Sequence, residues 1–151
     1  MAQGHLVTED TRSKFIGAES EPVSLEIEKG HILRFADAIQ DANPLYRDEV
    51  AARASRYGGI IAPPAFLRAL RMVLPKVDLN LPLSRILDGG SDWEYYHPVR
   101  AGDTITAVTR LVDLREREGR AGRMVFVVHE TTYTNQFGQV VAKQRSTMIR
   151  Y

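Results

Sequence analysis

Three long segments in the second half of the chain alternate apolar and polar residues with a period of two. They are residues 104–114, 123–134 and, more loosely, 140–151. Successive side chains of a strand point to opposite faces, so this period predicts strands that are buried on one face. Turns at 118–122 and 135–138 separate them, and we expect the three strands to form an antiparallel meander. A fourth strand is expected over 86–96.

The first half of the chain begins with a short strand expected over 23–27, which is followed by a helical pattern. Five apolar residues between 32 and 39 fall on one face of a helix. We expect this helix to end near Gln40, because Asn43-Pro44 favours a turn and proline restricts the residue before it to extended geometry. The pattern predicts an amphipathic helix that packs one face on a core.

Two further helical segments are expected before the long strands. A short one covers 50–55. A more apolar one follows Pro63-Pro64, since proline is tolerated in the first turn of a helix, and it runs to Leu74, where Pro75 ends it. Strand, helices and then long antiparallel strands predict an α+β fold with a sheet around one buried helix. An edge of such a sheet is left for a partner, so a dimer is expected.

Composition narrows the class of protein. The chain has 151 residues, no cysteine and a formal charge of +1, which fits a single soluble domain over residues 1–151. Without cysteine, neither disulfides nor thiolate-metal sites can form, and a cytoplasmic location is the expectation. Residues 1–17 lack the apolar core of a signal peptide, and no apolar run is long enough to cross a bilayer.

Net charge argues against a nucleic-acid-binding protein, and histidine spacing argues against a metal site. A net charge near zero argues against nucleic acid as the main partner. Four arginines lie close together in sequence: Arg53, Arg56, Arg68 and Arg71. They fit either a solvated helix face or the steering of a phosphate-bearing carrier such as coenzyme A. No pair of the four histidines has the spacing of a metal site, and we expect neither a metal nor a cofactor.

The motif most relevant to function lies between residues 35 and 66. Asp41-Ala42-Asn43-Pro44-Leu45-Tyr46 resembles the D-x-N-P-[IL]-H motif of the R-specific enoyl-thioester hydratases, with tyrosine in place of histidine. Residues 57–66, YGGIIAPPAF, resemble the segment that enters the central helix of these enzymes. Residues 96–103 match their P-V-x-x-G-D turn. The chain thus resembles the MaoC-like family of hydratases and dehydratases over most of its length.

This resemblance implies a hot-dog fold, in which an antiparallel sheet wraps around a central helix, and an acyl thioester of coenzyme A or acyl carrier protein as substrate. In the enzymes, an aspartate and a histidine hold a water that adds across the enoyl thioester, and a backbone amide meets the thioester oxygen. The corresponding catalytic candidates are Asp41 and Tyr46. The corresponding substrate-binding candidates are Asn43, Gly58, Gly59, Pro64 and Phe66.

Two of these positions depart from the family's pattern. A phenol with a pKa of about 10 is a neutral donor near pH 7 and a poor proton acceptor, whereas an imidazole with a pKa of about 6.5 can both give and take a proton. Pro64 stands where active enzymes have the glycine whose amide binds the oxyanion, and proline has no N–H. The pattern is similar to that of the non-catalytic subunit of two-chain 3-hydroxyacyl-ACP dehydratases. It implies an acyl-binding subunit in a homodimer, or in a heterodimer whose catalytic chain supplies aspartate and histidine.

Other interpretations remain open at this level. The chain could be a self-sufficient hydratase that uses Asp41 with Tyr46, a hot-dog acyl-thioester hydrolase in which Glu94 or Glu130 activates water, or a non-enzymatic acyl-CoA sensor. Asp41 could instead close a side-chain turn with Asn43, and Tyr46 could be a packed aromatic residue.

One histidine lies within a predicted strand. His129 shares its strand face with Val125, Val127 and Tyr133. A histidine in that setting is expected to be packed and hydrogen-bonded.

Overall fold

The computed structural model describes residues 4–120 and 122–151. Its helices are α1 (Glu9–Phe15), α2 (Lys29–Ala38) and α3 (Glu49–Ala54), with two 3-10 helices, η1 (Pro44–Tyr46) and η2 (Pro64–Ala69). Its strands are β1 (Val23–Glu26), β2 (Ile86–Tyr95), β3 (Thr104–Gly119), β4 (Gly122–Thr134) and β5 (Val140–Arg150). No helix within the described ranges is long and apolar enough to cross a membrane.

All five strands form one antiparallel sheet in the order β1-β3-β4-β5-β2. The predicted meander of β3, β4 and β5 is confirmed, and so are the α+β class and the strand ending near Tyr96. The turn predicted over 118–122 includes Ala121, which lies outside the described residues. Gly119 and Gly122 pair on either side of it. Strands β1 and β2 are the two edges of the sheet.

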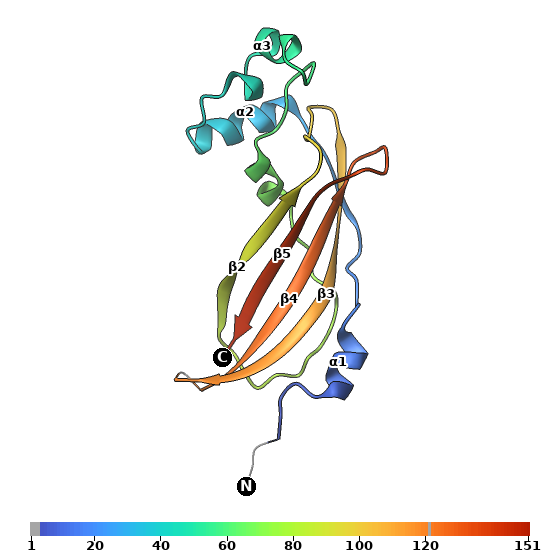
Figure 1. Cartoon of the computed structure of the whole chain (residues 1–151), viewed down its shortest axis with the longest axis vertical. Helices are drawn as coiled ribbons and strands as arrows, with labels where there is room; N and C mark the ends of the chain where they lie inside the picture. Colours follow the sequence, from blue (N-terminus) through green and yellow to red (C-terminus); the bar gives the residue numbers. More distant parts are fainter. Residues whose placement is uncertain (1–3, 121) are drawn as a thin grey trace.

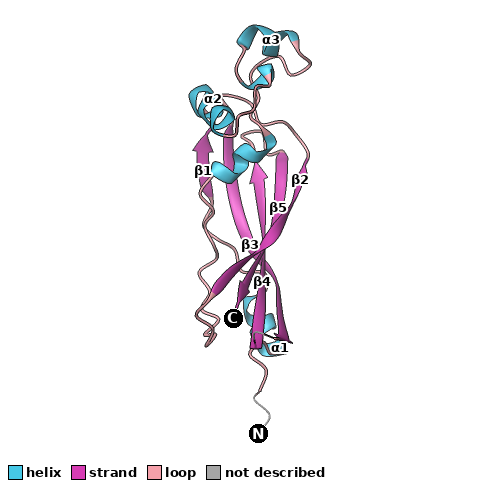
Figure 2. Cartoon of the chain, turned by 90° about the vertical axis from the view of Figure 1, so that its left-hand side faces the viewer, coloured by secondary structure: helices cyan, strands magenta, loops and turns pink. Residues whose placement is uncertain are grey.

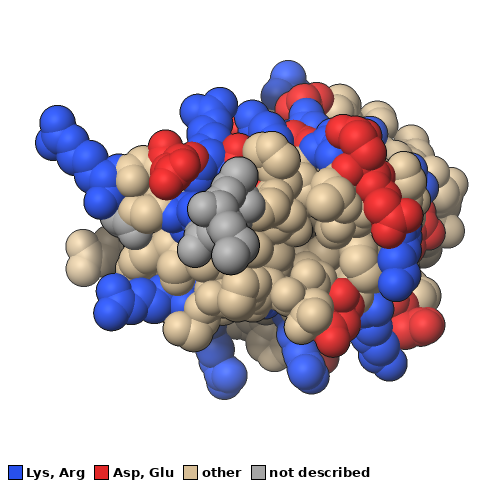
Figure 3. Space-filling view, turned by 90° about the horizontal axis from the view of Figure 1, so that it is seen from below, with Lys and Arg blue, Asp and Glu red and all other residues tan. Residues whose placement is uncertain are grey.

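Helices lie at both ends of this sheet. Helices α2 and α3 gather beyond one end, and α1 lies beside the other end, near the amino terminus (Figure 1). A side view shows the strands twisting along their length, with α2 and α3 at one end and α1 at the other (Figure 2). Seen from the α1 end, acidic and basic side chains are interspersed around an uncharged centre (Figure 3). This face therefore has no single-sign patch of the kind that binds nucleic acid.

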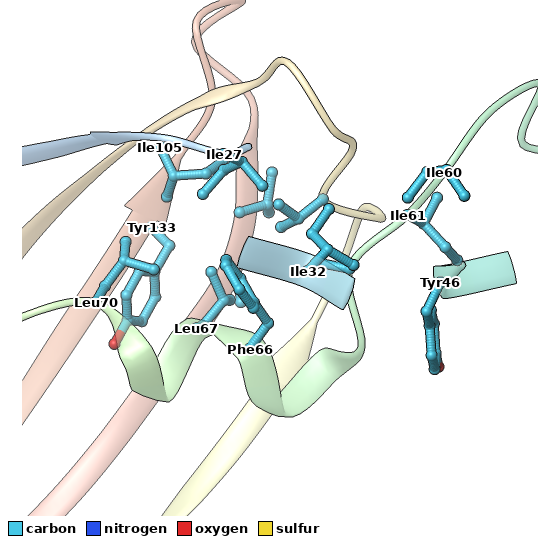
Figure 4. Packing of buried hydrophobic residues seen from close by; sticks show 14 of the residues in the cluster. Ile27, Ile32, Tyr46, Ile60, Ile61, Phe66, Leu67, Leu70, Ile105 and Tyr133 are labelled. Carbon is cyan, nitrogen blue, oxygen red and sulfur yellow. The ribbon is translucent and has the colours of Figure 1, made fainter. Parts of the chain in front are cut away.

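The alternating pattern of β4 defines the inner face of the sheet. Five alternate residues of this strand are buried: Val125, Val127, His129, Thr131 and Tyr133. The core on this face divides into two clusters. The upper cluster joins residues of α2 and η2, such as Ile32, Phe66 and Leu67, to the sheet (Figure 4). The lower cluster contains Leu111, Leu114, Val125 and Val127.

The prediction of a helix that follows Pro63-Pro64 and runs to Leu74 is wrong in length and type. Instead of continuing to Leu74, the segment forms the 3-10 helix η2 and ends at Leu70, whose backbone is extended (φ −71°, ψ 132°). A helix confined between Pro64 and Pro75 is too short for its own hydrogen bonds to stabilise it. Packing of the apolar side chains decides the conformation instead.

An extended segment replaces the rest of that helix. Residues 71–83 cross the inner face of the sheet without regular secondary structure. Four alternate side chains of this segment pack on the lower cluster: Val77, Leu79, Leu81 and Leu83. The segment therefore covers the half of the inner face that the short η2 does not reach.

The amino-terminal segment is tied to β3 by one carboxylate. The Glu116 side chain accepts hydrogen bonds from the amides of Leu6 (2.8 Å) and Val7 (3.1 Å), and Arg123 Nε donates to it at 2.8 Å. Partial burial raises the pKa of Glu116, but the hydrogen bonds from Arg123 and from these two amides outweigh it, and the pKa lies below its ordinary value. The charged carboxylate thus holds residues preceding α1 on the sheet.

Because the pKa of Glu116 is lowered on folding, its contribution to stability is present above its unfolded pKa and is lost as the pH falls through the folded value. We expect Glu116→Gln to lower the free energy of unfolding by about 1 kcal/mol near pH 7, and the difference from the wild type to shrink towards pH 4. Urea denaturation across this pH range measures both. The exposed neighbour Glu118→Gln is the matched control. A difference that stays constant with pH would contradict the assignment.

Candidate functional site

A cavity of about 440 Å³ lies at the helical end of the sheet. Three parts of the chain line it: the loop with η1, the stretch from residue 56 into η2, and the end of β2 with the residues that follow it. Its polar and aromatic lining includes Asn43, Tyr46, Arg56, Tyr57, Tyr95, Tyr96 and His97. These groups face an apolar wall, so the cavity can accept a ligand with both polar and apolar parts.

The apolar wall consists of the four consecutive residues 61–64, and it offers no amide to a ligand. The Ile61 amide donates to the Leu45 carbonyl at 3.2 Å, and the Ala62 amide donates to the Val99 carbonyl at 2.8 Å. Pro63 and Pro64 have no amide hydrogen. An oxyanion in contact with this wall would therefore find no backbone donor there.

A buried carboxylate positions this wall. Asp103, which is 6% exposed, accepts hydrogen bonds from the Arg100 amide at 2.8 Å and from the Gln136 side chain at 2.9 Å. These bonds fix the turn before β3, in which Gly102 adopts φ +92°. Ile61 pairs with Arg100 of the same turn as an isolated antiparallel bridge. The P-V-x-x-G-D motif therefore serves to place residues 61 and 62.

Tyr46 lines the cavity and is 8% exposed. Its ring lies apart from the other core side chains, with the hydroxyl pointing away from them (Figure 4). Burial raises the pKa of Tyr46, the negative charge of Asp41 raises it further, and the Asn43 side chain opposes the shift only in part. The phenol is therefore neutral near pH 7, where it can donate a hydrogen bond and cannot act as a base.

Asp41 is engaged in its own loop. One carboxylate oxygen accepts the Asn43 amide at 2.9 Å, so the side-chain turn left open by the sequence is present. The Asn43 side chain in turn accepts the Leu45 amide at 3.0 Å and caps η1. Asp41 is half-buried and is not among the residues that line the cavity. Its charge is nevertheless near enough to influence Tyr46.

The remaining predicted site residues divide between the cavity and the framework. Pro64 lines the cavity together with Asn43 and Tyr46. Gly58 adopts φ +69° in a turn closed by its amide on the Ser55 carbonyl, and Gly59 follows it. Neither glycine is a lining residue. Phe66 is 3% exposed, lies outside the cavity lining and packs edge-to-face on Phe35, with ring centroids 5.4 Å apart.

The two glutamates considered for a hydrolase lie elsewhere. Glu94 and Glu130 line a separate charged cavity of about 240 Å³ that also contains Lys143 and Arg145. They are not among the residues of the candidate cavity.

Several aromatic lining residues were not identified from the sequence. Arg56 donates to the Tyr57 hydroxyl at 2.6 Å and lies 4.8 Å from the centre of the Tyr57 ring. Tyr95 stacks on Trp93 at 5.8 Å, and Trp93 stacks on Tyr133 at 5.6 Å. The sequence signals in this region are Arg56 among the four arginines and the two motifs over residues 57–66 and 96–103, which contain Tyr57, Tyr96 and His97. Across residues 4–120 and 122–151, no cluster of three or more histidine or acidic side chains could hold a metal ion.

Comparisons with known proteins agree with this geometry. A family model described as FAS1-like, dehydratase domain region, matches residues 14–144. A UPF0336 protein of Saccharopolyspora erythraea is 33% identical over 141 residues, which cover 89% of this chain and 88% of that protein.

Two solved structures share the fold. A MaoC-like dehydratase from Rhodospirillum rubrum superposes with a TM-score of 0.72 and 25% identity, over 90% of this chain and 92% of that one. A C-terminally truncated HadBC (3R-hydroxyacyl-ACP dehydratase) complex from Mycobacterium tuberculosis gives a TM-score of 0.70 with 20% identity, over 89% of this chain and 96% of that one. The predicted hot-dog fold is confirmed. By its family model, its relative and its fold, the chain belongs to the MaoC-like hot-dog family of hydratases and dehydratases.

Proposed function

We propose that this chain is the acyl-binding, non-catalytic subunit of a 3-hydroxyacyl-thioester dehydratase, with the catalytic aspartate and histidine supplied by a partner hot-dog chain. The observation that supports the proposal is the wall formed by residues 61–64, which has no amide to donate and includes Pro64, the position at which the family resemblance implies the oxyanion donor. Removal of a single oxyanion donor costs roughly 10²- to 10³-fold in rate.

The proton chemistry supports the same conclusion. Hydration of an enoyl thioester needs one group that takes a proton from water and one that gives a proton to carbon. A neutral Tyr46 can only donate, since its pKa is raised. Asp41 is the other predicted catalytic residue, but its carboxylate accepts the Asn43 amide and is absent from the cavity lining. The cavity is therefore better equipped to hold a thioester than to transform it.

The polar side of the cavity suits the carrier of such a ligand. The Arg56 guanidinium is exposed and is held across the Tyr57 ring. Phosphate groups are present in both coenzyme A and the prosthetic group of acyl carrier proteins, and arginine binds phosphate with paired hydrogen bonds. We infer that Arg56 contacts the carrier and that the apolar wall contacts the acyl part.

The free edge of β2 is the proposed place of the partner chain. This strand pairs only with β5, and its residues are exposed except for the half-buried Trp93. Three large apolar side chains lie along it, with Ile86 58%, Leu87 53% and Tyr95 48% exposed. A long edge with exposed apolar residues is a template for pairing with another strand. The HadBC neighbour is itself a complex, which agrees with an assembly of this type.

The test is to purify the chain alone and together with a hot-dog chain that retains the aspartate and histidine. We expect the isolated chain to hydrate crotonyl-CoA and longer enoyl-CoA at a rate at least about 10²-fold below that of the complex. Asp41→Asn in this chain should leave the rate of the complex unchanged within about two-fold, whereas replacing the partner's histidine should abolish it. Substantial turnover by the isolated chain, lost in Asp41→Asn, would instead establish a self-sufficient hydratase.

A second prediction concerns the structural role of Asp41. Asparagine keeps a side-chain oxygen for the Asn43 amide, but alanine does not. We expect Asp41→Ala to lower the free energy of unfolding by about 1 kcal/mol and Asp41→Asn to lower it by less than half as much. Urea denaturation of the isolated chain gives both values. Equal losses in the two variants would mean that the charge of Asp41, and not its hydrogen bond, stabilises the loop.

A further inference from the structure

Polar residues cross the inner face of the sheet between its two apolar clusters. Thr109, Thr131 and Gln144 occupy neighbouring positions on β3, β4 and β5. His129 pairs with Ser146 of β5, and Ser146 pairs with Ser91 of β2. A polar band within a core is costly unless its members are hydrogen-bonded.

All but one of the most buried residues of this band have a side-chain hydrogen-bond partner among the described residues. The hydroxyls of Thr109 and Thr131 lie 2.9 Å apart, and the Tyr133 hydroxyl donates to Gln144 at 3.2 Å. His129 is 4% exposed, and no hydrogen bond joins its ring to another described residue. The expected packed position is confirmed, but the expected hydrogen bond is not found.

The His129 ring opens into two cavities. One, of about 420 Å³, lies under the extended segment 71–83, and the other, of about 210 Å³, lies between the end of η2 and β2. Both are lined by Ile86, His129 and Met148. Among the described residues, every side-chain nitrogen or oxygen that is fully shielded from solvent has a hydrogen-bond partner. The ring nitrogens of His129 have no such partner, so they are not fully shielded and face this space. We call the smaller cavity the His129 pocket.

The lining of the His129 pocket specifies the chemistry of a ligand. Its apolar lining residues are Met72, Ile86, Leu87 and Met148. Its uncharged polar groups beside the imidazole are the side chains of Ser91, Gln144, Ser146 and Thr147. Burial lowers the pKa of His129, so the ring is uncharged near pH 7 and can both donate and accept a hydrogen bond. The charged lining residues Arg68 and Asp88 are exposed.

We propose that the His129 pocket binds a hydrophobic ligand through one uncharged oxygen substituent, a hydroxyl or a ketone, which hydrogen-bonds to the His129 ring. A carboxylate or an ammonium group does not suit this position, because a charge would be desolvated with no counter-charge among the buried lining residues. The pocket is distinct from the candidate cavity: Arg68 of η2 lines the former, and the preceding Leu67 lines the latter. The ligand is either the distal part of an acyl chain or a separate neutral lipid.

The test follows the imidazole signals of the full-length chain by NMR, since the sequence has only four histidines. We expect 1-octanol and 2-octanone to shift the His129 ring signals to saturation, and octanoate to bind at least about ten-fold more weakly. Ser146→Ala, at a partly exposed position, should weaken 1-octanol binding with little effect on folding. His129→Leu should weaken it about ten-fold or more, and His129→Gln should recover part of the loss.

A second arm identifies the source of the oxygen. If 8-hydroxyoctanoyl-CoA also shifts the His129 signals, the ligand is an acyl tail, and if only the free alcohol does so, it is a separate lipid. Either result supports the pocket. Absence of any saturable shift with both probes, with the variants folded, would overturn it, and water alone would then be assigned to the ring. Because binding is read directly, this outcome is independent of whether the chain or its complex hydrates thioesters.

Discussion

The buried carboxylate of Asp103 is the interaction on which the candidate cavity depends. Its two oxygens hold the Arg100 amide and the Gln136 side chain, and Gln136 in turn accepts the Thr104 amide at 3.0 Å. The turn before β3 and the turn between β4 and β5 are therefore tied to one buried charge. Ile27 completes the assembly, because it exchanges backbone hydrogen bonds with Gly102 and Asp103. Charge-assisted bonds of this kind are strong when water is excluded.

The placement of this turn determines the chemistry of the wall opposite it. Val99 accepts the Ala62 amide, so one of the few amides before η2 is used to attach the wall to the turn. The following proline pair then removes the next two amides. The attachment of residues 61 and 62 and the proline pair together leave this wall of the cavity without a free amide.

The parts of the fold that were predictable are those in which a single periodicity dominates. The strands β3, β4 and β5 are long, and their alternation cannot be satisfied by a helix. The spacing from Phe66 to Leu74 fits a helix, but a helix confined between prolines is too short to form on its own, and packing on the sheet overrides the pattern. The alternation at residues 77–83 was overlooked, because an extended segment without a neighbouring strand resembles a loop. At the site, the spacing of the motif identified Tyr46, but the separation of Asp41 from the cavity depends on one local turn that spacing does not encode.

The inner face of the sheet shows why position within a strand matters as much as residue type. The polar band that includes Thr109, Thr131 and His129 lies between the upper and lower apolar clusters and keeps them apart. The hydroxyls of the two threonines hydrogen-bond to each other across neighbouring strands, so their burial destabilises the core little. His129 faces Leu111 on one side and Ser146 on the other, and neither forms a bond with its ring. An apolar residue at position 129 would pack on this face without burying an unpaired polar group. The imidazole is therefore better explained by a ligand in the adjoining cavities than by packing.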